Sequence, residues 1–122
     1  MLDAKDLRIG NLILVHNHYV ATIERIGKDI GVKTYGEKIS QIDYIELQYL
    51  TPIELTDEWL LRFGLIKDNG YPYKFLDGFI KMRNGEYFFK YHNLDIKLNY
   101  VHNLQNLHYI FTQTELTLKD EK

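Results

Sequence analysis

Basic and aromatic side chains alternate between residues 79 and 97, and this combination can hold an anionic partner. The turn signals Asp77-Gly78 and Asn84-Gly85 divide the stretch into strands, in which successive side chains point to opposite faces. One face of the resulting sheet collects six candidate partner-binding residues: Phe79, Lys81, Arg83, Phe88, Lys90 and Lys97. Aromatic rings on a sheet can stack bases while cations hold phosphates. The same residue types supply the dominant contacts to an acidic protein surface. A third interpretation is a solvated face whose Phe rings are covered by the N-terminal part of the chain.

The stretch from Tyr100 to Phe111 is a second candidate site, because helix-period spacing gives it one half that is polar yet almost uncharged. No Lys, Arg, Asp or Glu occurs between positions 100 and 113. His102, Gln105 and Tyr109 are the candidate partner-binding residues on this half. Low charge fits the centre of a protein interface. Burial beneath the N-terminal lobe, with hydrogen bonds to loop backbone, explains the same residues equally well.

Metal and catalytic chemistry find little support in the residue pattern. At 100° per residue, His102 and His108 lie about 120° apart on a helix and do not form a metal-binding pair. His16 and His18 flank a turn, and no H-E-x-x-H spacing occurs. The chain has no cysteine, and it contains no G-x-S-x-G, P-loop or G-x-G-x-x-G motif. We therefore predict no catalytic residue, no metal, no cofactor and no enzymatic activity.

The first half of the chain reads as short strands separated by turns. Strands are predicted over 12–16, 19–26 and 30–34, with one or two more within 38–47. The hydrophobic phase slips between Ile23 and Ile26, which predicts a bulge. A compact helix follows, capped by Thr56 and ended by Gly64. This half is expected to be a β-rich, SH3-like lobe followed by a short helix.

The second half reads as a four-stranded antiparallel meander followed by a C-terminal helix packed on a sheet. Its predicted elements are a linker over 68–72, strands over 73–76, 79–83, 86–91 and 94–98, a helix to about residue 112, and a frayed charged tail over 117–122. The apolar half of the helix should pack on the other meander face, formed by Ile80, Met82, Tyr87, Phe89 and Tyr91. The sequence thus predicts the α+β class and a single compact domain, 1–122, with sub-lobes 7–66 and 71–116.

Composition favours a protein of the cytoplasm. The chain has 122 residues with a formal net charge of −2, which argues against a general DNA-coating protein. No stretch approaches the roughly 20 apolar residues of a membrane span. The absence of cysteine fits a reducing compartment. We therefore expect no membrane partner.

Three stretches of the sequence carry a resemblance to known proteins. They are Leu7-Arg8-Ile9-Gly10-Asn11, then Pro52-Ile53-Glu54-Leu55-Thr56 with Trp59-Leu60-Leu61-Arg62-Phe63-Gly64, and finally Tyr100-Val101-His102-Asn103-Leu104-Gln105-Asn106-Leu107 with Thr114-Glu115-Leu116. In these stretches the chain resembles a family of small uncharacterised proteins of Bacteroidetes phages and prophages. The family has no assigned activity, so the resemblance carries no functional residue to this chain. It implies a mobile genetic element in a bacterial host cell.

These observations together predict a non-enzymatic binding protein of phage or prophage type. Its expected action is inhibition of a bacterial defence system, in the manner of an anti-CRISPR protein that binds an RNA-guided nuclease or its RNA-bound form. The first alternative is an RNA- or single-strand-binding module that uses the basic and aromatic meander face. The second alternative is an enzyme of unknown type.

Overall fold

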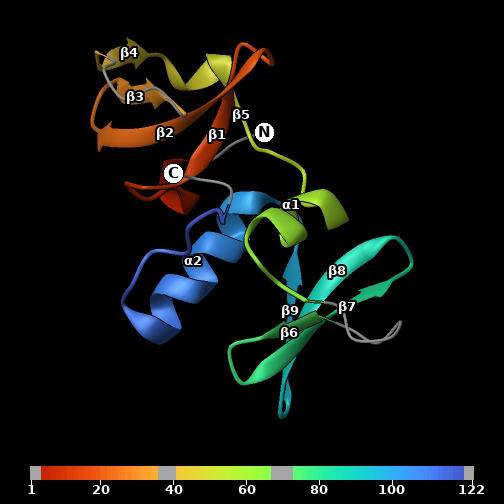
Figure 1. Ribbon diagram of the computed structural model, residues 1–122. Helices are drawn as coiled ribbons and strands as arrows, with labels where there is room; N and C mark the ends of the chain where they lie inside the picture. Colours follow the sequence, from red (N-terminus) through yellow and green to blue (C-terminus); the bar gives the residue numbers. More distant parts are fainter. Residues whose placement is uncertain (1–3, 36–40, 67–72, 120–122) are drawn as a thin grey trace.

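The computed structural model describes residues 4–35, 41–66 and 73–119, and these residues form an α+β fold with two antiparallel sheets. The sheets lie at opposite ends of the molecule, with both α-helices between them (Figure 1). The N-terminal sheet has the strand order β4-β3-β2-β1-β5. Its elements are the 3-10 helix η1 (Ala4–Asp6), β1 (Leu12–Val15), β2 (Tyr19–Ile26), β3 (Ile30–Thr34), β4 (Asp43–Ile45), the 3-10 helix η2 (Leu47–Tyr49) and β5 (Leu50–Thr51).

Most strand predictions in this sheet are confirmed, including β2, β3 and the bulge. The β2–β3 register shifts between Ile23 and Arg25, so that Ile23 pairs with Val32 and Ile26 with Ile30, on one face of the sheet. Ile23 is buried there, whereas Ile26, at the end of β2, is 42% exposed. The first turn lies one residue earlier than predicted. His16 and Asn17 both have φ near 53°, as the two central residues of a type I′ hairpin require, so β1 ends at Val15.

Helix α1 (Asp57–Arg62) begins and ends as its sequence signals predict. The Thr56 hydroxyl accepts a 3.4 Å hydrogen bond from the backbone N–H of Trp59. Gly64 follows the helix with φ of 87°, a backbone conformation that residues other than glycine rarely adopt. The short helix is held by burial of Leu60 and Phe63 rather than by its own hydrogen bonds.

The second sheet is the predicted meander, with strand order β6-β7-β8-β9. Its strands are β6 (Tyr73–Phe75), β7 (Gly78–Arg83), β8 (Glu86–Tyr91) and β9 (Leu94–Leu98). Asn84 and Gly85 form the predicted turn, with φ of 55° and 79°. The predicted Asp77-Gly78 turn is displaced by one residue, because Leu76 takes the positive φ of 54° and Gly78 pairs with Phe75 inside the sheet.

Gly78 belongs to β7 because this strand and β8 approach each other closely there. A Cβ atom at position 78 would lie 2.3 Å from the backbone oxygen of Lys90 and 3.0 Å from the Phe89 ring. A glycine is therefore required at position 78 for the close contact between β7 and β8. The prediction from the Asp-Gly pair, which placed Gly78 in a turn, is wrong.

Helix α2 (Val101–Thr112) follows β9; its first half meets β1 at Leu12, and Phe111 near its end packs on Phe89 and Tyr91 of the meander. Tyr100 precedes it as the cap residue, and the Tyr100 backbone N–H donates a 3.0 Å hydrogen bond to Asn103 Oδ1. Gln113, with φ of 60°, ends the helix. Leu104 and Leu107 of the apolar half are buried, whereas Ile110, at its edge, is 66% exposed.

Two clusters of buried apolar residues support the fold. One lies within the N-terminal sheet and includes Ile13, Ile23 and Val32. The other joins both halves of the chain, since Leu12 packs with residues of α1, α2 and the meander. Met82 shares the inner face with Ile80 as predicted, since it pairs with the buried Tyr87, but its side chain is 56% exposed and does not join the core.

The prediction of a frayed tail is wrong for the residues before 120. Leu118 is buried, and the Lys119 backbone N–H donates a 2.6 Å hydrogen bond to the carbonyl oxygen of Arg62. These contacts fasten the end of the described chain to α1. The predicted linker over 68–72 and part of the 38–47 stretch lie outside the described residues.

Candidate partner-binding surface

The six predicted meander residues lie together on one face of the second sheet. Phe79 pairs with Lys90, and Phe88 pairs with both Lys81 and Lys97. Three further charged residues share this face by strand parity, namely Lys74, Glu86 and Asp95. We call the following nine residues the outer sheet face: Lys74, Phe79, Lys81, Arg83, Glu86, Phe88, Lys90, Asp95 and Lys97. Lys74 was missed by the sequence analysis, although the alternation of Tyr73, Lys74 and Phe75 was the signal for it.

The outer sheet face is open to solvent around Phe79. This ring is 44% exposed, so the N-terminal lobe does not cover it. Lys74, Lys81 and Arg83 are exposed as well, while Phe88 is partly buried. Burial of Phe88 comes partly from Arg83, whose guanidinium carbon lies 4.3 Å from the centroid of the Phe88 ring.

Carboxylates neutralise part of the positive charge on this face. Glu86 lies 3.1 Å from the Lys97 amine, and Asp95 lies 3.5 Å from the Arg83 guanidinium and 4.0 Å from the Lys90 amine. These pairs are exposed, so they contribute little to stability. Lys74 and Lys81 form no ion pair with any residue in the described ranges. Their charge is therefore available to a partner.

The polar half of α2 meets the chain's own N-terminal segment. Gln105 is 2% exposed. Its side-chain oxygen accepts a 2.8 Å hydrogen bond from the Leu12 backbone N–H, and its side-chain nitrogen donates a 3.2 Å hydrogen bond to the Gly10 carbonyl oxygen. Gln105 thus fills the role that the second interpretation assigned to it, bonding to loop backbone beneath the N-terminal lobe.

Asn106 extends this polar contact. Its side-chain oxygen accepts hydrogen bonds from the side chains of Asn11, at 2.8 Å, and Arg8, at 3.2 Å. Arg8 also forms a bidentate ion pair with Glu115. The Arg8 guanidinium carbon lies 4.3 Å from the centroid of the Tyr109 ring. Tyr109 is partly buried, and its ring packs against Arg8 of the chain's own N-terminal segment.

His102 is buried at the first turn of α2. Its ring stacks on the Tyr100 ring at a centroid distance of 5.7 Å, and its Nδ1 atom has no hydrogen-bond partner among the described residues. Burial lowers the pKa of His102, and the Asp6 carboxylate opposes part of that shift. Burial therefore favours the neutral form of the imidazole, and little of the ring is available to another molecule.

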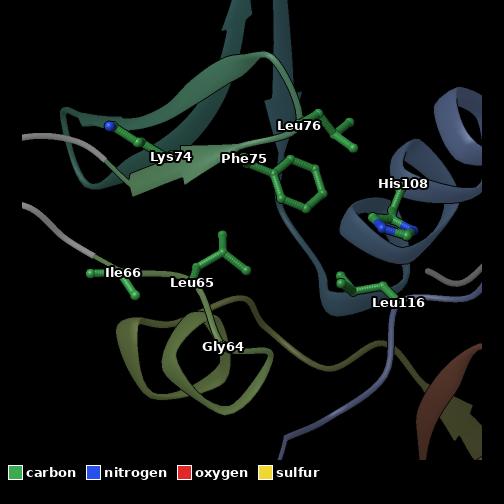
Figure 2. A pocket seen from close by; sticks show the side chains of 8 residues that line it. All are labelled: Gly64, Leu65, Ile66, Lys74, Phe75, Leu76, His108 and Leu116. Carbon is green, nitrogen blue, oxygen red and sulfur yellow. The ribbon is translucent and has the colours of Figure 1, made fainter.

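A groove of about 450 Å³ lies between α1, β6 and α2 (Figure 2). Its lining is mostly apolar, with Leu65, Phe75 and Leu116 around the His108 ring. His108 Nδ1 lies 3.0 Å from the Thr114 carbonyl oxygen, which fixes the ring. Figure 2 shows the Lys74 amine directed away from Phe75 and His108. Among the described residues that line the groove, only His108 directs a polar side-chain group into it.

Within residues 4–35, 41–66 and 73–119, no three His, Asp or Glu side chains gather closely enough to hold a metal ion. None of the helices formed by these residues is long and apolar enough to cross a membrane. Comparison with protein-family models, with curated proteins and with solved structures finds no match to this chain.

Proposed function

We propose that this chain is a non-enzymatic binding protein and that the outer sheet face contacts its partner. The observation that carries the proposal is the charge of this face, which is opposite to that of the whole chain. The face holds five of the 15 basic residues and two of the 17 acidic ones. A local positive surface on an acidic protein attracts an anionic partner and orients its approach.

The exposed Phe79 ring supports a binding role for the same face. An exposed aromatic ring among cations matches the residue types that dominate binding interfaces. The polar half of α2 is less suited to a partner, since Gln105, Asn106 and Arg8 already bond within the chain.

The partner that we propose is a bacterial defence nuclease guided by RNA. The resemblance to phage and prophage proteins supplies the biological setting, which is the cytoplasm of an infected host. A ribonucleoprotein is anionic over its RNA, and the outer sheet face complements that charge. The protein would then inhibit the nuclease by occupying a surface that the nuclease needs, with no chemistry of its own.

A plaque assay tests this function. Host cells with an active RNA-guided nuclease are infected with a phage that the nuclease targets, with and without expression of this protein. We expect expression to raise the efficiency of plating, and affinity capture of the tagged protein to recover the nuclease in a fixed stoichiometry. The Lys74→Glu/Lys81→Glu variant should lose both effects, because it reverses the charge of the face.

Lys28→Glu is the control, since Lys28 is an exposed lysine in the turn between β2 and β3, away from the outer sheet face. If the charge-reversed face retained full capture and protection, the assignment of the surface would be wrong. If no nuclease were recovered and plating never rose, the proposed function itself would fail.

A further inference from the structure

We infer that the ligand of the outer sheet face is single-stranded RNA, with Phe79 stacking on a base and the surrounding lysines holding phosphates. This inference rests on the proposed function, because it takes the outer sheet face as the binding surface. It adds the chemical group on the partner that the face contacts.

Three lysines surround the exposed ring. Lys74 on β6 and Lys90 on β8 are the cross-strand neighbours of Phe79, and Lys81 lies two residues further along β7 on the same face. Neighbouring strands are about 4.8 Å apart, and residues two apart in a strand are about 6.8 Å apart. Each cation is thus within one side-chain length of a group stacked on the Phe79 ring. Since phosphates and bases alternate along a single strand, one stacked base brings its own flanking phosphates to these amines.

The cations beside the ring suit a phosphate backbone. The amines of Lys74 and Lys81 are point charges, which bind phosphate oxygens in any orientation. The arginine of this face, Arg83, already lies over Phe88 and near Asp95. The two amines are therefore the charges that a strand stacked on Phe79 would meet first.

Phe88 and Arg83 provide a second stacking position beside the first. Phe88 sits on β8 diagonally across from Phe79, since Phe79 pairs with Lys90 and Phe88 with Lys81. The guanidinium over the Phe88 ring presents a flat cation, on which unpaired bases also stack. Both positions lie on the central strands of a four-stranded sheet. A duplex keeps its bases paired inside and cannot use them, so the face should prefer a single strand.

Fluorescence anisotropy with a labelled single-stranded RNA of roughly 10 nucleotides tests the inference. We expect the intact protein to bind this RNA more tightly than a duplex of equal length. Phe79→Leu keeps an apolar side chain but removes the ring, and should weaken binding about tenfold. Lys74→Ala/Lys81→Ala should reduce the slope of log affinity against log salt by roughly 1.4, about 0.7 for each lost phosphate contact.

Lys28→Ala is the control for a lost surface charge, and circular dichroism verifies that each variant is folded. Equal affinity for duplex and single strand, or no effect of Phe79→Leu, would overturn the stacking role. Absence of RNA binding, together with loss of nuclease capture in the charge-reversed variant, would overturn this inference and leave the proposed function standing on a protein contact. If the charge-reversed variant still captured the nuclease, the outer sheet face would be excluded as the binding surface, both for the proposed function and for this inference.

Discussion

The side-chain oxygen of Gln105 accepts a 2.8 Å hydrogen bond from the backbone N–H of Leu12, the first residue of β1. The side-chain nitrogen of Gln105 simultaneously donates to the Gly10 carbonyl oxygen at 3.2 Å. One buried amide of α2 therefore supplies a donor and an acceptor to the edge of the N-terminal sheet, as a neighbouring strand would. The two halves of the chain are joined by a polar contact as well as by the apolar core.

Replacing Gln105 with Leu should reduce the free energy of unfolding by about 2 kcal/mol or more, because two backbone groups lose their partners in a buried place. Gln48→Leu is the control, since Gln48 is exposed, and it should change stability by less than about 0.5 kcal/mol. Urea denaturation measures both. Equal effects of the two substitutions would mean that the Gln105 contact contributes nothing.

Stability should fall in alkali because of Tyr87. Burial, followed by the 2.6 Å hydrogen bond to Asp57, raises the pKa of Tyr87 above its ordinary value of 10.0. The unfolded chain then releases this proton at lower pH than the folded protein does, so the free energy of unfolding declines as pH rises above 10. Tyr87→Phe should flatten that decline in denaturation curves. Tyr44→Phe, at a ring that is 57% exposed, should leave it unchanged.

Mild acid should destabilise the protein through His102. Burial lowers the pKa of this imidazole below 6.5, whereas the unfolded chain binds a proton at the ordinary value. The stabilisation is present above pH 6.5 and is lost as pH falls below it. His102→Leu should flatten the dependence of unfolding free energy on pH between about 7 and about 5. His18→Leu, at an exposed position, is the comparison, and an equally flat curve for it would contradict the assignment to His102.

Two glycines of the meander should respond differently to alanine. Gly78→Ala should lower the free energy of unfolding by about 3 kcal/mol, because the new Cβ atom meets backbone. Gly85→Ala places its Cβ atom in open space, so the strain comes from the φ of 79° alone. This strain should lower the free energy of unfolding by about 1 kcal/mol. Thermal unfolding compares them. A larger loss at Gly85 would show that the β7–β8 backbone can separate at little cost.

Local signals in the sequence were sufficient for most of the fold. Asn84-Gly85 and the Thr56 cap act through neighbouring atoms, so residue type alone predicts their conformation. Gly78 was misplaced because its role depends on Lys90, a residue of another strand. Leu118 was assigned to a frayed tail because its neighbours in the sequence are charged. Its burial depends on elements that are distant in the sequence, so the local pattern does not indicate it.

The candidate surface was predictable to a similar degree. Strand parity alone gathers Phe79, Lys81 and Phe88 on one face, and the register agrees. The polar half of α2 could not be interpreted in this way. An uncharged amide such as Gln105 has the same hydrogen-bonding groups whether it bonds to its own backbone or to another molecule. Only the position of Leu12 in space distinguishes the two.

The Gln105 contact has a consequence for the timing of synthesis. The two hydrogen bonds of Gln105 join residues that are 93 and 95 positions apart in the sequence. The ion pair between Arg8 and Glu115 joins residues that are 107 positions apart. During translation the backbone N–H of Leu12 therefore lacks its hydrogen-bond partner until the ribosome has produced α2. Contacts of such long range close slowly. A nascent chain that stalls before residue 105 should thus be a target for chaperones and proteases, whereas a chain that includes α2 holds β1 against this helix.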